Sequence, residues 1–193
     1  MDNPPSVKAF HLNSAISCFI MFKYSYFVIF LFACNAGGSP DETLPLWFNQ
    51  LFKKKGLDKQ YIINAFNKPA SIQADFNRDG TSDIAVLVAH KSNSKKGILL
   101  VHGKTMSHYL LGVGNSFGSG GDDFEWMDKW SLYTSEYASE TLFDDETGDI
   151  LGGKEVKLAG PGILVEANED GAAVAGGVIY WDGKNYTWIH QGE

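Results

Sequence analysis

Apolar positions near residue 44 recur with the period of an α-helix. They fall at i, i+3, i+4, i+7 and i+8, which places them on one face of a helix. These positions are Leu44, Trp47, Phe48, Leu51 and Phe52. Thr43 can cap the helix, Pro45 suits its first turn, and Gly56 can end it, while lysines 53–55 lie at the negative end of its dipole. The sequence therefore predicts an amphipathic helix over residues 43–56.

From residue 83 onward the apolar residues occur in short runs rich in β-branched side chains, separated by turn residues. Residues 84–88 are apolar at every position, so they are predicted to form a central strand that is buried on both faces. Residues 57–67, which precede this region, fit either a second helix or a strand. The other predicted strands are residues 98–102, 107–111, 130–134, 156–158, 163–166 and both halves of 178–189.

The last two predicted strands are joined by Asp182-Gly183, a dipeptide typical of a two-residue hairpin turn, because both central positions need positive φ. Such a turn pairs Ile179 with Tyr186 and places Trp188 over Gly177. Taken together, the pattern predicts one α+β domain over residues 43–193 in which strands dominate. We expect an antiparallel sheet of hairpins with the N-terminal amphipathic helix packed on it.

The first 34 residues have the pattern of an export leader. An apolar run over residues 24–33 follows Lys23 and ends at Cys34. Leu31-Phe32-Ala33-Cys34 resembles the lipobox of bacterial lipoproteins, although Phe32 departs from the small or branched residue usual there. The resemblance implies that Cys34 is acylated and becomes the first residue of a protein anchored in the cell envelope. Membrane contact through this lipid would be on the periplasmic face or on the surface of the outer membrane.

The start of the leader has more than one interpretation. Met21 gives a more compact leader than Met1, so we expect translation to start at Met21, with Met1 as the alternative. An uncut span over residues 15–34 is an alternative, but it carries Lys23 near its centre, at a cost of about 2.5–3.5 kcal/mol. Plain secretion is another alternative. Residues 35–42 are polar, with glycine and proline, and are predicted to form a flexible tether.

Composition excludes several classes of function. Both cysteines, Cys18 and Cys34, lie in the leader, so the domain has no thiol for catalysis, a disulfide or a thiolate metal site. Residues 34–193 carry 14 basic and 22 acidic side chains, a net charge of −8. Arg78 is the only arginine, which argues against a nucleic-acid partner because such a partner needs a cluster of basic residues.

One segment carries a recognisable ion-binding pattern. Residues 75–83 read DFNRDGTSD, with oxygen-bearing side chains at positions 1, 3, 5 and 9 and glycine at position 6. Oxygens at these positions converge when the chain coils tightly around an ion, and position 7 offers its carbonyl. The expected ligands are Asp75, Asn77, Asp79, Thr81 and Asp83. Five or six hard oxygens suit Ca²⁺ better than Mg²⁺, which prefers to keep its waters.

The loop is not an EF-hand, because position 12 is Val86 and no exit helix is predicted. A D-x-N-x-D-G-x-x-D loop that runs into an apolar strand resembles the calcium loops of FG-GAP and VCBS-type repeats. The resemblance covers about fifteen residues and implies Ca²⁺ on the same five residues.

A partial second copy at residues 166–171 lacks the last acid, since Val174 stands there, and is predicted to be a polar turn. One good copy does not predict a propeller. An ion-free turn remains the alternative for the first copy.

The other constellations are weaker. Residues 112–121 are rich in glycine but lead into acids that would repel phosphate, so a mobile loop is predicted and a nucleotide partner is not. The acids and tryptophans that follow could form a surface for a partner or a second cation. These residues are Trp126, Trp130, Asp122 and Asp123. The histidines, including His102 and His190, form no catalytic motif and are predicted to be ordinary strand residues.

We therefore expect a non-enzymatic, membrane-tethered envelope lipoprotein that binds one structural Ca²⁺ and a protein or glycan partner. A metal-dependent envelope hydrolase is the first alternative, and a cleft that joins the acids to a histidine would favour it. A small inhibitor of an enzyme, acting through residues 112–128, is the second alternative and requires an ordered, exposed loop.

Overall fold

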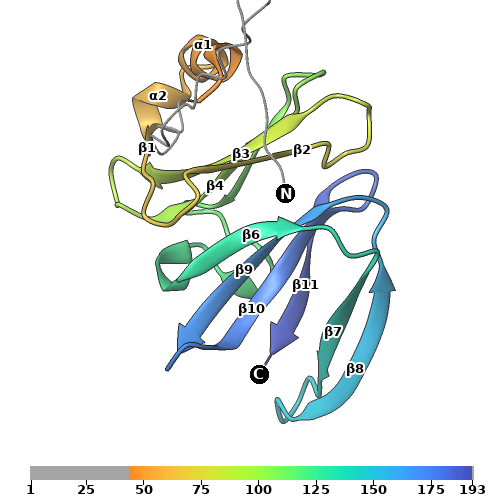
Figure 1. Cartoon of the computed structure of the whole chain (residues 1–193). Coiled ribbons are helices and arrows are strands. Elements are labelled where there is room, and N and C mark those ends of the chain that lie inside the picture. The colour runs from red at the N-terminus through yellow and green to blue at the C-terminus, as the bar shows by residue number, and fades with distance from the viewer. Residues whose placement is uncertain (1–43, 193) are drawn as a thin grey trace, which may run out of the picture. The chain divides into compact units, whose positions relative to one another are not determined.

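The computed structural model of the protein describes residues 44–192 (Figure 1). The predicted leader with Cys34, the two candidate start residues, the tether over residues 35–42 and the cap Thr43 all lie outside the described residues. Antiparallel strands dominate the described part of the chain, as the hydrophobic pattern predicted.

The first sheet has the strand order β1-β3-β4-β5, and β2 also pairs with β3. Its strands are β1 (Tyr61–Ile63), β2 (Ser71–Ala74), β3 (Asp83–His90), β4 (Lys96–Val101) and β5 (His108–Gly112). The second sheet has the order β11-β10-β9-β6. Its strands are β6 (Lys129–Tyr133), β9 (Gly162–Glu169), β10 (Ala172–Trp181) and β11 (Tyr186–Gly192). A separate hairpin pairs β7 (Tyr137–Phe143) with β8 (Ile150–Lys157).

Strand β3 is the centre of the first sheet and is buried on both faces, as its sequence predicted. Ile84, Val86 and Val88 face one side, where they join the cluster that contains helix α1 (Leu46–Lys54). Ala85 and Leu87 face the other side, toward the second sheet. Because alternate side chains of a strand point to opposite faces, β3 contributes residues to two separate hydrophobic cores.

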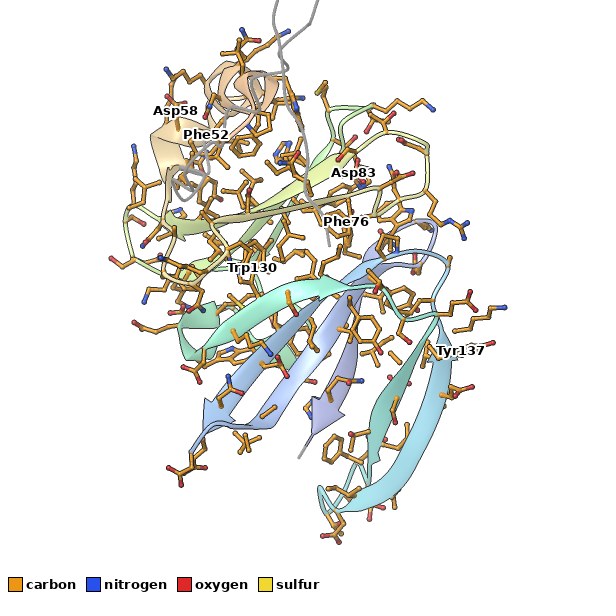
Figure 2. The ribbon with its side chains drawn as sticks, in the orientation of Figure 1. Phe52, Asp58, Phe76, Asp83, Trp130 and Tyr137 are labelled. Carbon is orange, nitrogen blue, oxygen red and sulfur yellow. The ribbon has the colours of Figure 1, made fainter. Side chains whose placement is uncertain are left out.

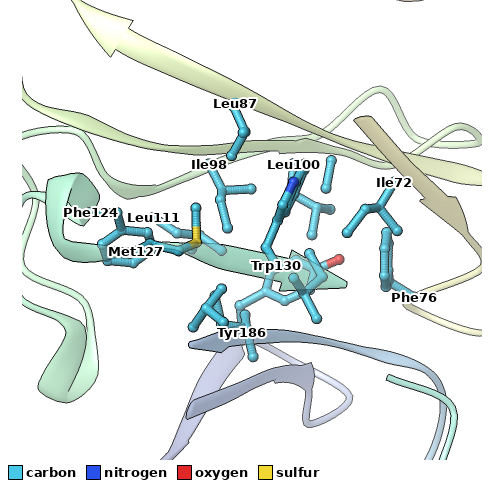
Figure 3. Close-up of a cluster of buried hydrophobic side chains, with 14 residues drawn as sticks. Ile72, Phe76, Leu87, Ile98, Leu100, Leu111, Phe124, Met127, Trp130 and Tyr186 are labelled. Atoms are coloured by element: carbon cyan, nitrogen blue, oxygen red, sulfur yellow. The ribbon is translucent and has the colours of Figure 1, made fainter. Parts of the chain in front are cut away.

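The core between the two sheets is built around Trp130. Its side chain is 1% exposed, and its indole N–H donates to the carbonyl of Pro69 at 2.8 Å. Figure 3 shows Ile98 and Leu100 of the first sheet directed toward it, with Tyr186 on the opposite side. Residues of β9 and β10, such as Val165 and Ile179, complete this layer.

Helix α1 begins after Pro45, which is its N-cap residue, and it is followed by Gly56 at φ +69°. Phe48, Leu51 and Phe52 are the buried residues of the helix. The sequence allowed either a helix or a strand over residues 57–67. The structure has both in this segment, a short helix α2 (Leu57–Gln60) followed directly by strand β1.

The predicted register of the last hairpin is wrong. Ile179 pairs with Trp188, and Tyr186 pairs with Trp181, because the loop contains four residues instead of two. The Asp182 carboxylate accepts the N–H groups of Lys184 and Asn185, both at 2.7 Å, and this local cap enlarges the turn. The indole of Trp188 nevertheless covers Gly177, where a Cβ would meet its Cε2 at 2.2 Å.

Candidate functional site

The candidate ion loop connects β2 to β3, and its last acid, Asp83, is the first residue of β3. Two residues of the loop have left-handed backbone conformations, Arg78 at φ +58° and Gly80 at φ +85°. Glycine adopts this conformation without strain, whereas a residue with a Cβ seldom does. Both residues lie within the tight turn between β2 and β3. Figure 2 shows Asp83 and Phe76 at this end of the first sheet.

Side-chain oxygens converge on the backbone inside the turn. The amide of Asp79 donates to Asp75 Oδ1 at 2.9 Å and to Asn77 Oδ1 at 3.1 Å, so both oxygens contact the same nitrogen. The amide of Gly80 donates to Asp75 Oδ2 at 2.9 Å. The amide of Thr81 donates to Asp79 Oδ1 at 3.0 Å. These hydrogen bonds hold the side chains of Asp75, Asn77 and Asp79 against the backbone amides of the turn.

Asp79 is a partly exposed acid of the loop. Partial desolvation acts to raise its pKa, but hydrogen bonds from Asn77 and Thr81 and the charge of Lys104 lower the pKa of Asp79 overall. Its carboxylate is therefore the charged form at neutral pH, which is the form that a cation requires.

Asp83 has a different environment from the other acids. It is 0% exposed, and its Oδ2 accepts the amides of Phe76 at 3.0 Å and Asn77 at 3.3 Å. Its Oδ1 accepts the amide of Gly103 at 2.9 Å. Burial raises the pKa of Asp83, although the hydrogen bond from Gly103 and the charge of His102 act in the opposite direction. The carboxylate thus ties the loop to the turn that follows β4.

The loop offers a cation oxygen donors of mixed type. Within residues 44–192, no three His, Cys, Asp or Glu side chains are grouped so that they could hold a metal ion by themselves. A site here must therefore use mixed oxygen donors, which are two carboxylates, the Asn77 amide oxygen and the Thr81 carbonyl. Such hard oxygens are the donor chemistry of Ca²⁺. Asp83 already accepts three N–H groups, so it has less capacity left for an ion than the other acids have.

A buried polar pair lies behind Asp83. His102 is 3% exposed, and its Nε2 lies 2.8 Å from the hydroxyl of Tyr186. The rings of Tyr109 and Trp181 pack on the imidazole at centroid distances of 4.9 and 5.1 Å. Burial lowers the pKa of His102 against the opposing charge of Asp83, and burial raises the pKa of Tyr186. The sequence predicted an ordinary strand histidine, and the fold places it next to the loop acids but out of reach of solvent.

The expected partner surface is changed by the structure. Trp130 is buried in the core and cannot contribute to a surface. Asp122 pairs with Lys95, and Asp123 accepts the amide of Lys96 at 2.9 Å and caps the 3₁₀ helix η2 (Phe124–Trp126). These two acids therefore hold the segment in place. Asp122, Asp123 and Trp126 all remain partly exposed.

Trp126 lines a cavity of about 220 Å³ that the sequence did not predict. Trp188 and His190 of β11 form other parts of its wall, together with Ser119, Gly120, Ala175 and Gly176. The Trp126 and Trp188 ring centroids lie 6.3 Å apart at an angle of 76°. The Trp188 indole nitrogen and both His190 ring nitrogens have no hydrogen-bond partner among the described residues.

The glycine-rich segment is packed against the same tryptophan. It contains the 3₁₀ helix η1 (Gly118–Gly120), and a Cβ at Gly118 would meet the Trp188 Cβ at 2.3 Å. The Trp126 indole N–H donates to the Gly120 carbonyl at 2.9 Å. The glycines therefore permit close packing, in place of the mobile loop that was predicted. At the partial second copy of the motif, Asp170 and Gly171 form the tight turn between β9 and β10.

No protein-family model, curated protein or solved structure matches the chain. Within residues 44–192, no helix has both the length and the apolar character that crossing a bilayer requires.

Proposed function

We propose that the protein is a non-enzymatic lipoprotein of the bacterial cell envelope, anchored through a lipid on Cys34. Its α+β domain, with α1 packed on the first sheet, holds one structural Ca²⁺ on residues 75–83 and binds a protein or glycan partner. The observation that supports the ion site is the approach of the Asp75 and Asn77 oxygens to one amide, that of Asp79. The lipid anchor is supported by the sequence Leu31-Phe32-Ala33-Cys34.

In this proposal the ion stabilises the hairpin of β2 and β3. Asp75 and Asp79 carry like charges on one coil, and a divalent cation between their oxygens would neutralise that repulsion. Asn77 and the Thr81 carbonyl would supply neutral oxygens. Because the loop leads directly into the central strand β3, an ion there would increase the stability of the first sheet.

Partner binding is proposed for the surface around Trp126. The cavity between Trp126 and Trp188 offers aromatic faces, and the unpaired polar atoms beside it could accept or donate hydrogen bonds after a small rearrangement. Aromatic walls with a few polar groups are common in binding sites for small molecules and sugars. The packing of η1 and the Trp126–Gly120 hydrogen bond give the segment a defined shape, which also supports enzyme inhibition as the second candidate.

The metal-dependent hydrolase has less support. His102 lies beside Asp83, which is the pairing that this alternative requires. However, His102 is 3% exposed and Asp83 is 0% exposed, so a substrate cannot reach either side chain.

Calorimetric titration of the Cys34→Ser chain with Ca²⁺ tests the ion site. We expect a binding heat and a melting temperature that falls when a chelator is added, and both effects should be lost in Asp79→Ala. The matched control is Asp144→Ala, since Asp144 also accepts two backbone amides, those of Glu146 and Thr147, in a turn outside the motif. Absence of both heat and chelator sensitivity in the parent chain would contradict the proposal.

The lipid anchor has a separate test. In bacteria that express the chain, labelled palmitate should be incorporated into the parent protein and not into Cys34→Ser. Incorporation into Cys34→Ser would overturn the lipobox assignment, and absence of label from both proteins would overturn lipidation itself.

A further inference from the structure

The outer side of helix α1 carries a stripe of apolar and basic residues that the core does not use. Leu46 is 72% exposed, although it is a large apolar side chain, and Lys53 and Lys54 are exposed on the same side of the helix. The buried residues of the helix, Phe48 and Phe52, point to the sheet on the opposite side. The stripe is therefore left free by the packing of α1.

A groove runs beside this stripe. It has a volume of about 390 Å³ and lies between α1 and the turn that joins β4 to β5. The turn contributes Met106, which is itself an exposed apolar residue. The groove is lined by Trp47, Gln50, Leu51, Lys54, Lys55 and Met106. Burial, together with the nearby charge of Lys55, lowers the pKa of His108 at the start of β5, so Lys55 lies close to that strand.

The charge of this surface is opposite to that of the protein as a whole. Residues 34–193 have a net charge of −8, yet three consecutive lysines are gathered here. Among residues 44–192, none of Lys53, Lys54 and Lys55 forms an ion pair with a carboxylate, whereas Lys95, Lys96, Lys129 and Lys154 each do. The positive charge is therefore available to an external anion.

The position of α1 in the sequence brings it near the proposed anchor. Leu44 is only ten positions after Cys34 in the sequence, and ten steps of chain span at most about 36 Å when fully extended. A lipid on Cys34 would therefore hold α1 close to the bilayer surface. Tethering of this kind raises the effective concentration of a weak second contact without any change in its intrinsic affinity.

We infer that the α1 surface, defined as Leu46, Trp47, Lys53, Lys54, Lys55 and Met106, docks on an anionic phospholipid surface. This inference rests on the proposed lipoprotein function, in which Cys34 supplies the primary attachment. Leu46, Trp47 and Met106 insert at the level of the headgroups, and the lysines contact lipid phosphates. A lipid chain combined with a basic and apolar patch is the two-part arrangement that gives stable membrane attachment.

Docking of this surface fixes the orientation of the domain. The acidic remainder of the protein is repelled by an anionic bilayer, while the α1 surface is attracted. Since α1 covers the face of the first sheet away from the second sheet, the second sheet and the cavity at Trp126 would be turned from the membrane. Partner binding at that cavity would then be unobstructed by lipid.

Vesicle sedimentation of residues 35–193, which lack both the apolar leader and the lipidated cysteine, tests the inference without any contribution from either. We expect binding to vesicles that contain phosphatidylglycerol, little binding to pure phosphatidylcholine, and loss of binding as salt is raised to about 500 mM. The double variant Lys54→Glu/Lys55→Glu should bind about tenfold more weakly or worse. The matched charge control is Lys184→Glu, which changes an exposed lysine in the turn between β10 and β11.

The apolar part of the surface has its own pair of variants. Leu46→Ser should weaken binding severalfold, whereas Ile150→Ser, at a residue 51% exposed on β8, should leave it unchanged. Both side chains are exposed, so neither variant should alter the melting temperature, and Leu46→Ser serves as the test if the lysine variant fails to fold.

Three results would overturn the inference. The first is equal binding to neutral and anionic vesicles or to neither, and the second is a loss with Lys184→Glu as large as that with Lys54→Glu/Lys55→Glu. Palmitate labelling reports on Cys34 alone, so failure of lipidation and failure of this docking surface are distinguishable. Retention of parent-like binding by Lys54→Glu/Lys55→Glu would also contradict the inference.

Discussion

The hydroxyl of Tyr186 on β11 lies 2.8 Å from Nε2 of His102, the residue that follows β4. The two residues are 84 positions apart in the chain; His102 lies just beyond a strand of the first sheet, and Tyr186 is in the second sheet. Because both are buried, this hydrogen bond joins the two sheets in a region from which water is largely excluded, where an unpaired polar group is costly.

Tyr186→Phe should therefore destabilise the domain by about 1–3 kcal/mol, because it leaves a buried nitrogen of His102 without its partner. The measurement is the free energy of unfolding from urea titration. Tyr137→Phe is the control, since Tyr137 is 42% exposed, and it should change the stability little. Equal effects of the two variants would contradict a special role for the hydrogen bond.

Acidification should destabilise the domain below about pH 6.5, the ordinary pKa of histidine. Burial lowers the pKa of His102 and of His108 in the folded state, so the unfolded chain binds more protons as the pH falls through 6.5. The free energy of unfolding therefore decreases with falling pH, by up to about 1.4 kcal/mol per pH unit for each histidine. Asp83 acts in the opposite sense at lower pH, because its pKa is raised.

Urea titrations at pH 7.5 and 5.5 measure this dependence. His102→Gln should reduce the difference in unfolding free energy between the two values, even if the variant is less stable at both. His90→Gln is a suitable comparison, since His90 is less buried than His102. An unchanged pH dependence in His102→Gln would assign the effect to other groups.

Asp83→Asn should cost about 2–3 kcal/mol of stability whether or not calcium is present. The variant retains one oxygen acceptor for three backbone amides and places an NH₂ group against at least one N–H donor. Chemical denaturation in excess chelator measures this effect directly. Asp149→Asn changes an acid that accepts a threonine hydroxyl at the surface, and should cost little. A loss for Asp83→Asn that appears only with calcium would place Asp83 among the ion ligands instead.

Gly177→Ala should destabilise the domain by about 1–3 kcal/mol, and could require Trp188 to move. The added Cβ would lie 2.2 Å from Trp188 Cε2, which is far inside van der Waals contact. Gly153→Ala is the matched control, since its Cβ would meet the Ser139 hydroxyl at 3.2 Å and the Glu140 carbonyl at 3.8 Å. Thermal unfolding followed by tryptophan fluorescence measures both the stability and the displacement of the ring.

The local patterns in the sequence were sufficient to predict the elements with a strong hydrophobic pattern. Every position of residues 84–88 is apolar, and the structure places them in the centre of a sheet. Strand β7 was not predicted because only Ala138 of its seven residues is buried, so its sequence lacks the alternation that marks a strand. Strand β2 has four residues, too few for a period to be recognised. The hairpin register was wrong because an aspartate side chain enlarged the turn.

Spacing along the chain predicted that the loop oxygens would gather, and the contacts of Asp75 and Asn77 agree with that geometry. It could not predict that Asp83 reaches Gly103, because that contact depends on how β3 and β4 pair. The same limit applies to the cavity of Trp126, Trp188 and His190. Its walls come from segments about sixty residues apart, and only the folded chain brings them together.

The bond from Gly103 to Asp83 has a consequence for the alignment of the two central strands. Asp83 stands at the start of β3, and Gly103 stands two residues beyond the end of β4, so the bond fixes one end of their ladder. A slip of one residue would move the carboxylate away from the amide. It would also exchange the side chains that face α1 with those that face the second sheet, since neighbouring residues of a strand point to opposite sides. One buried aspartate thereby selects a single alignment among those that a uniformly apolar strand would otherwise allow.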